Sequence, residues 1–208
     1  MFFSFDGVDG AGKSTQIELF RRWLEQEQRR VELCRDPGST ELGERLRRIV
    51  LENSDIPIDR TSEMFLYMAS RAQLVKQVIR PALAAGKTVI SDRFLLANVV
   101  YQGYAGGLDV GQLWRVGEVA VGGLHPDVTI VLDLDVTAAQ QRIERSLDRM
   151  EAQGAEFLER VRHGFLREAQ LDHERIIVID ANRPVDAVQH EIRSAVTDWM
   201  KSLTSVEK

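Results

Sequence analysis

The chain has 208 residues, of which 44% are apolar and 28% are charged, which is enough for one domain with a substantial buried core. Its net charge of -5 argues against a protein whose main task is to coat nucleic acid or an anionic membrane. Cys34 is the single cysteine, which excludes an internal disulfide or a cysteine-based metal cluster and suits a reducing compartment. No apolar run approaches the roughly 18 residues that span a bilayer, so we expect a cytoplasmic protein.

Short runs rich in β-branched and aromatic residues alternate with longer amphipathic segments along the chain. The short runs predict five strands, at residues 2–5, 30–34, 88–92, 128–135 and 175–180. Apolar residues recur every three or four positions elsewhere, which predicts helices over residues 41–52, 63–86 and 184–203. This alternation predicts a three-layer α/β fold, in which a five-stranded, mainly parallel sheet is flanked by helices on both faces. No repeat or linker divides the chain, so we expect one domain over residues 1–208.

The stretch GVDGAGKST follows the first predicted strand and leads into a predicted helix. It matches the G-x-x-x-x-G-K-[ST] phosphate loop in the context that this motif requires, and so favours a P-loop NTPase fold. Glycines let backbone N–H groups surround phosphate oxygens, and the helix N-terminus attracts the same anion. We expect Lys13 to bridge the β- and γ-phosphates and Ser14 to bind Mg²⁺. The predicted ATP-binding residues are Gly7, Val8, Asp9, Gly10, Ala11, Gly12, Lys13, Ser14 and Thr15.

Two further predicted strands end in an arginine beside an aspartate. The segments RDPGST (35–40) and DRF (92–94) lie where an open α/β sheet places its ligands. Arg35 and Arg93 are therefore candidate phosphate ligands, and either Asp36 or Asp92 could hold Mg²⁺ or its waters. The chain has no N-K-x-D motif, which argues against a GTPase switch. A second anion site facing the phosphate loop favours a transferase.

Six motifs in order resemble those of the thymidylate kinases, which transfer the γ-phosphoryl group of ATP to dTMP. They are DGVDGAGKST, RDPGST, SRAQ, DRF, YQG and LDRME, and the resemblance extends from the phosphate loop to the final helix. It implies direct, in-line transfer that gives dTDP and ADP, with Mg²⁺ and without a covalent intermediate. It also implies a homodimer, for which the apolar residues of 63–86 and 113–124 could supply the interface.

The resemblance also implies an acceptor site on the third helix and beyond the third strand. Tyr67 occupies the position from which a ring stacks on the base, and Arg71, four residues later, resembles the arginine that reads the thymine edge. Phe65 faces elsewhere, so we expect it in the core. The remaining substrate-binding residues implied are Asp9 for sugar and phosphate, Arg35 and Pro37, Arg93 as the phosphate clamp, Asn98 and Gln102 for base and sugar, and Tyr101 against the 2′ position of the sugar.

Phosphoryl transfer in such enzymes uses a mobile arginine that neutralises charge on the transferred group. Some relatives carry it inside the phosphate loop, where this chain has Gly10, so it must come from elsewhere. A lid segment around residues 140–155 offers Arg142, Arg145 and Arg149, spaced three and four apart as on one helix face. Arg149 matches the lid pattern best. The predicted catalytic residues are these three arginines together with Lys13, Asp9 and Arg93.

Two alternative functions remain compatible with the motifs. DRF replaces the more usual D-R-Y of the family, and Ala97 replaces a common serine, so the acceptor could be another nucleotide or a deoxynucleoside. A non-catalytic ATP-binding switch is the other alternative. Two anion-binding turns and a lid of arginines argue against a switch, because a switch needs no acceptor site. We expect ATP and dTMP as the ligands, and neither nucleic acid nor a membrane as a partner.

Overall fold

The sheet has five parallel strands. The computed structural model describes residues 1–52, 56–143, 149–150 and 153–206. Its strands are β1 (Phe2–Asp6), β2 (Val31–Arg35), β3 (Thr88–Asp92), β4 (Val128–Asp133) and β5 (Ile176–Asp180). They pair in the order β2-β3-β1-β4-β5, and each neighbouring pair is parallel. The prediction of a five-stranded, mainly parallel sheet is therefore confirmed.

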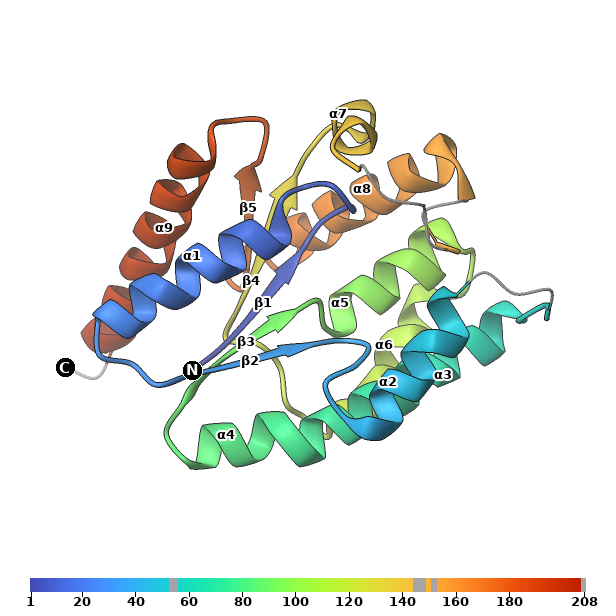
Figure 1. Cartoon of the computed structure of the whole chain (residues 1–208), viewed down its shortest axis with the longest axis horizontal. Helices are drawn as coiled ribbons and strands as arrows, with labels where there is room; N and C mark the ends of the chain where they lie inside the picture. The colour runs from blue at the N-terminus through green and yellow to red at the C-terminus, as the bar shows by residue number, and fades with distance from the viewer. Residues whose placement is uncertain (53–55, 144–148, 151–152, 207–208) are drawn as a thin grey trace.

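Helices cover both faces of this sheet. Figure 1 shows α1 and α9 side by side on one face, with α4, α5 and α8 on the other. The helices described are α1 (Lys13–Gln26), α2 (Glu41–Leu51), α3 (Arg60–Leu74), the π-helical η1 (Val75–Ile79), α4 (Arg80–Ala84), α5 (Leu95–Asn98), the π-helical η2 (Val99–Ala105), α6 (Val110–Val121), α7 (Val136–Gln141), α8 (Ala155–Leu171) and α9 (Val185–Val206). None of the helices within the described residues is long and apolar enough to cross a bilayer.

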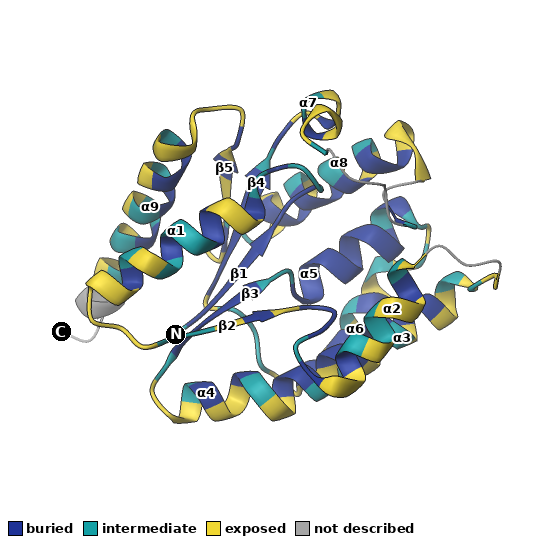
Figure 2. Ribbon diagram, in the orientation of Figure 1, coloured by how far each residue is buried: buried dark blue, intermediate teal, exposed yellow. Residues whose placement is uncertain are grey.

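The core follows from the alternation of side chains along the strands. Phe3 packs edge to face against Phe20 of α1 with ring centroids 5.3 Å apart, whereas Phe2 points to the opposite face and meets Phe94 at 5.0 Å. Figure 2 shows the central strands buried and the outer surface of α1 exposed. Phe65 is 54% exposed, so its predicted place in the core is wrong. Tyr67 lies on the buried face of α3, and Phe65, two positions earlier, points to roughly the opposite side of the helix.

The carboxyl ends of parallel strands meet at one edge of the sheet. The phosphate loop follows β1, the turn that begins with Asp36 follows β2, and Arg93 follows β3. Backbone hydrogen bonds join these turns, since the Asp36 N–H donates to the Asp92 carbonyl and the Arg93 N–H donates to the Phe5 carbonyl. The fold thus brings the three predicted anion-binding segments together at this edge.

Candidate active site

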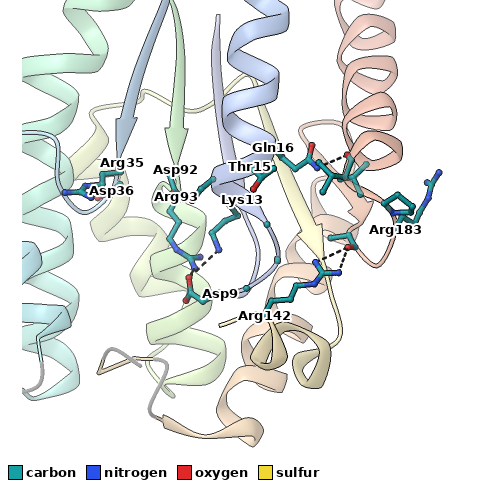
Figure 3. Close-up of a pocket in the computed structure, with 18 of the residues that line it drawn as sticks. Asp9, Lys13, Thr15, Gln16, Arg35, Asp36, Asp92, Arg93, Arg142 and Arg183 are labelled. Atoms are coloured by element: carbon teal, nitrogen blue, oxygen red, sulfur yellow. Dashed lines mark hydrogen bonds and ion pairs between the residues drawn. The ribbon is translucent and has the colours of Figure 1, made fainter. Parts of the chain in front are cut away.

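A cavity of about 750 Å³ lies at the carboxyl edge of the sheet (Figure 3). The phosphate loop, the ends of β2 and β3, and the segment after β5 form its walls. Among the described residues, its lining includes both positively and negatively charged side chains. The lining residues include Asp9, Lys13, Ser14, Arg35, Asp36, Arg47, Asp92, Arg93, Arg142 and Arg183. The cavity therefore suits a polyanion that is held together with a cation.

The phosphate loop is packed closely against β4 and α7. A Cβ on Gly7 would lie 2.4 Å from the Leu132 carbonyl oxygen, and one on Gly10 would lie 2.2 Å from that of Ala139. Both glycines have positive φ angles, of 127° and 86°, which other residues rarely adopt. Sequence and backbone therefore agree that these positions require glycine.

The ammonium group of Lys13 lies inside the curl of the loop. Its Nζ donates to the carbonyl oxygens of Val8 at 2.8 Å and Gly7 at 3.2 Å, and it lies 3.4 Å from Asp9 Oδ1. Burial and the nearby Arg93 guanidinium lower the pKa of Lys13. A buried cation that is held only by loop oxygens and one carboxylate is suited to meet phosphate oxygens.

Arg93 connects the phosphate loop to the acceptor side of the site. Its Nη1 donates to the Gly7 carbonyl at 2.9 Å, and its Nη2 donates to Asp9 Oδ1 at 2.7 Å. Burial raises the pKa of the Asp9 carboxyl, but the charges of Arg93 and Lys13 outweigh it and hold that pKa well below its usual range. The φ angle of Arg93, 65°, is rare for a residue other than glycine, and such backbone conformations concentrate at functional sites.

The carboxylates of this cavity fit a hard divalent cation. Asp92 Oδ1 and Asp36 Oδ1 are buried and have no hydrogen-bond partner among the described residues. Asp92 and Ser14 also line a neighbouring hollow together, whereas Asp36 is engaged by Arg71. Within the described ranges, no group of three or more acidic, histidine or cysteine side chains could hold a metal. One or two carboxylates suit Mg²⁺, which is usually held by one or two protein ligands and completes its shell with water and phosphate oxygens.

A second cavity of about 100 Å³ adjoins the first and is lined by buried side chains. It contains Tyr67 and Arg71 of α3, together with Asn98, Tyr101 and Gln102, which the sequence assigned to the acceptor. Pro37 lines it as well. The two cavities have Asp9, Asp36, Arg47 and Arg93 in common, so they adjoin at these side chains, of which Asp9 belongs to the phosphate loop.

Arg71 is fixed by a buried ion pair. Its Nε donates to Asp36 Oδ2 at 2.5 Å and its Nη1 donates to Asn98 Oδ1 at 3.0 Å. Burial raises the pKa of the Asp36 carboxyl despite the charge of Arg71. A pair buried so completely costs much desolvation free energy, which makes a purely stabilising role for it a poor explanation.

Tyr101 lines the smaller cavity and contacts two residues that the cavities have in common. Its hydroxyl lies 3.2 Å from both Asp9 Oδ2 and Arg93 Nη2, and its ring packs against Phe157 and Phe165. Burial raises the pKa of its hydroxyl well above the usual range, so Tyr101 acts as a neutral hydrogen-bonding group. The two phenylalanine rings, at centroid distances of 6.3 Å, pack against the tyrosine ring.

The sequence model of the thymidylate kinase family matches residues 5–192. The chain belongs to this family. A thymidylate kinase of Rhodopirellula baltica is 47% identical to it over 91% of this chain and 77% of the relative. The thymidylate kinase of Kosmotoga olearia is 41% identical over 92% of this chain and 93% of the relative. That of Oleidesulfovibrio alaskensis is 44% identical over 95% of this chain and 98% of the relative.

A solved thymidylate kinase has the same fold. The crystal structure of the enzyme from Ehrlichia chaffeensis matches with a TM-score of 0.77 and 30% sequence identity, over 94% of this chain and 98% of that chain. The resemblance drawn from the sequence motifs is therefore confirmed, and with it the predicted P-loop fold class.

Arg142 and Arg149, two of the predicted lid arginines of this thymidylate kinase family member, do not share a helix face. Helix α7 ends at Gln141, Arg142 caps it, and Arg149 lies in a turn, so the predicted helical arrangement is wrong for these two residues. Arg142 lines the larger cavity and donates to the Ala181 carbonyl at 3.4 Å. Arg149 is not among the described lining residues of either cavity and pairs with Glu63. Arg145 lies outside the described residues, as does part of the predicted lid.

Three charged residues of the site were absent from the sequence-based set. Arg47 of α2 lines both cavities, donates to the Pro37 carbonyl at 2.9 Å and has no carboxylate oxygen within 4 Å in the described part of the chain. Arg183 lines the larger cavity, and Glu63 of α3 is buried beside the smaller one. Arg35, by contrast, is half exposed and pairs with Glu44 at 2.8 Å at the cavity's edge.

Proposed function

We propose that the chain transfers the γ-phosphoryl group of ATP to the phosphate of dTMP, giving dTDP and ADP. ATP binds with its phosphates on the phosphate loop in the larger cavity, and dTMP binds with its base in the smaller one. The single observation that carries this proposal is the junction of the two cavities, where both are lined by Asp9, Asp36, Arg47 and Arg93. Two bound phosphates would meet at that junction, as in-line transfer requires.

The donor phosphates are held by the loop and by Lys13, whose charge offsets that of the β- and γ-phosphates. The phosphate of dTMP is held by Arg93 and Arg47, of which Arg47 has no carboxylate within ion-pair distance in the described residues. Arg142 is the lid arginine that lines the donor cavity, so we assign to it the neutralisation of charge on the transferred group. Arg35 is assigned a place at the outer edge of the phosphate site.

Ser14 and Asp92 would hold Mg²⁺, since their side chains line the same hollow and Asp92 Oδ1 has no partner among the described residues. Bound there with ATP, Mg²⁺ supplies positive charge to the phosphates. Asp9 keeps its negative charge because Arg93 and Lys13 flank it, and it orients Arg93 toward the junction.

The base of dTMP is assigned to the smaller cavity. Tyr67 stacks on it, while Arg71 and Asn98 meet its polar edge with Gln102. Tyr101 occupies the space that a ribose 2′-hydroxyl would need. Arg71 presents only donors, which favours a base with a carbonyl at the edge that it meets.

We also propose that the protein acts as a cytoplasmic homodimer. Phe65 of α3 is 54% exposed and Val119 of α6 is 85% exposed, and these helices pack against each other, so they could form one apolar contact face. Analytical ultracentrifugation tests the dimer, and a single species of monomer mass at micromolar concentration would contradict it. Cell fractionation tests the compartment.

The function is tested by measuring ADP release from MgATP with dTMP present and with dTMP omitted. We expect rapid release only with dTMP, and lower kcat/KM values for dCMP, dUMP and thymidine. A higher kcat/KM for one of these acceptors would reassign the substrate. Release that no acceptor stimulates would favour the non-catalytic ATP-binding switch.

A further inference from the structure

Glu63 of α3 is a buried carboxylate that the proposed function does not use. It is 1% exposed, and it is not among the described residues that line either cavity. Its Oε1 accepts a hydrogen bond of 2.8 Å from Gln102 Nε2, and its Oε2 pairs with Arg149 Nη2. Burying a carboxylate is costly even when it is paired, so its presence next to the base cavity requires an explanation.

Glu63 ends a chain of hydrogen bonds that runs along the wall of the smaller cavity. Arg71 Nη1 donates to Asn98 Oδ1 at 3.0 Å, Asn98 Nδ2 donates to Gln102 Oε1 at 2.6 Å, and Gln102 Nε2 donates to Glu63. All four residues are buried, and three of them line the cavity. The fourth, Glu63, reaches the base only through Gln102.

The two ends of this chain fix its direction. A guanidinium group only donates hydrogen bonds, a carboxylate only accepts them, and an amide does both. With Arg71 at one end and Glu63 at the other, each amide between them must accept on the side of Arg71 and donate on the side of Glu63. The amides therefore offer the base one fixed pattern of donors and acceptors. Arg149 pairs with the other oxygen of this carboxylate, Oε2.

We propose that Glu63 is a positioning residue for base selection, which fixes the orientation of the Gln102 amide toward the acceptor base. The inference rests on the proposed function. Thymine and cytosine exchange donor and acceptor at ring positions 3 and 4, so a rotated or mobile amide costs discrimination between them. Replacing Glu63 by a side chain that can also donate should therefore weaken the preference for dTMP over dCMP.

The test compares Glu63→Gln with the wild type in steady-state kinetics with dTMP and dCMP. Glutamine keeps the size of Glu63, but it places an NH₂ group against either Arg149 or Gln102. We expect the ratio of kcat/KM for dTMP to that for dCMP to fall about tenfold, with KM for ATP unchanged. Glu168→Gln is the matched control, because Glu168 is also a buried helical glutamate, bonded to the Tyr104 hydroxyl at 2.8 Å, and we expect it to leave the ratio unchanged.

A double-mutant cycle identifies the route of the effect. If Glu63 acts through Gln102, then Glu63→Gln adds nothing to the loss of preference in a Gln102→Leu background. Additive losses, or an unchanged ratio in a folded Glu63→Gln protein, would overturn the inference. Should Glu63→Gln fail to fold, Glu63→Asp can be used, because it keeps the charge but moves the carboxylate away from Gln102. An unchanged ratio of kcat/KM for dTMP to that for dCMP in Glu63→Asp would also overturn the inference. A wild-type protein without dTMP-dependent turnover would instead refute the proposed function.

Discussion

The two cavities of this protein are built in different ways. The cavity proposed for the donor is about 750 Å³, and the phosphate loop, one continuous stretch whose backbone groups come from neighbouring positions, forms one of its walls. The acceptor cavity is about 100 Å³ and depends on side chains that α3, α5 and η2 contribute. Those side chains are oriented by buried partners such as Asp36 and Glu63.

This difference indicates where each site is vulnerable. A site made of backbone tolerates many substitutions but loses most of its activity when its one essential cation is removed. A site made of linked side chains should lose affinity and selectivity in steps, since each partner contributes part of the geometry. Substitutions in the two sites should therefore differ in the size of their effects.

Lys13→Ala should have the largest effect. It should lower kcat about a thousandfold, because no other ammonium group takes its place inside the described loop and its charge acts on the transition state. Steady-state kinetics measure kcat, and circular dichroism checks the fold. Lys87→Ala is the control, since Lys87 pairs with Glu32 outside both cavities and should leave kcat unchanged. Near-normal kcat in folded Lys13→Ala would remove the donor site from the proposal.

Arg142→Ala should lower kcat about a hundredfold with little change in either KM, because Arg142 lines the donor cavity. Arg149→Ala should affect kcat less, since that guanidinium is paired with Glu63. The same kinetic assay on both variants decides the order. If Arg149→Ala lowers kcat more than Arg142→Ala does, the catalytic role belongs to Arg149. If neither substitution changes kcat, neither arginine has this role.

Tyr67→Ala should raise KM for dTMP about tenfold and leave KM for ATP unchanged, because stacking on the base is binding that the ground and transition states have in common. Ser62→Ala is the control, since this side chain is exposed on the same helix and is not among the described residues that line either cavity. Equal increases in both KM values for Tyr67→Ala would indicate that α3 is merely destabilised.

Asp6 should make stability depend on pH in the direction opposite to that of most carboxylates. Burial raises its pKa to about 6, so the folded protein binds this proton more tightly than the unfolded chain does. The free energy of unfolding therefore falls as pH rises, by about 1 kcal/mol between about pH 5 and pH 7 from this group. Urea unfolding of Asp6→Asn should lack that loss, whereas Asp198→Asn on the surface of α9 should retain it. Identical pH profiles for Asp6→Asn and the wild type would contradict the assignment.

Tyr101→Ala should raise kcat/KM for ribothymidine monophosphate relative to dTMP by only a fewfold, because a hydroxyl is a small group to exclude. Parallel kinetics with both acceptors measure this ratio. Tyr104→Ala, at the next helical turn and bonded to Glu168, should leave the ratio alone. An unchanged ratio for Tyr101→Ala would show that the ring does not select the sugar.

The sheet and the donor loop were predictable because their signals are local. The predicted strands end within one or two residues of the observed ones, for instance at 88–92 for β3. The phosphate loop lies within a single stretch in which glycine spacing determines the backbone. By contrast, Phe65 shows that an apolar residue on a helix can be placed only when its neighbours in space are known.

On the proposed acceptor side, several residues that line the smaller cavity were predicted, but the residues that hold them were not. Tyr67 and Arg71 were implied by the resemblance to the thymidylate kinases, whereas Glu63 gave no signal, because its partners lie 39 and 86 residues away along the chain. Arg47 belongs to a helix with several arginines, and only the folded arrangement distinguishes the one that lines both cavities. The helical arrangement predicted for Arg142 and Arg149 was wrong because α7 ends at Gln141.

The close approach of Gly10 to α7 also limits how such an enzyme can evolve. Any side chain at position 10 would collide with the Ala139 carbonyl, so an arginine cannot enter the loop by a single substitution while α7 keeps its place. Moving the cation from lid to loop would require α7 to retreat at the same time, and α7 ends at Gln141, one residue before Arg142. The catalytic role proposed for Arg142 and an arginine in the loop are thus alternatives that a single substitution at position 10 does not connect, and a designer who grafts one onto the other must rebuild both segments together.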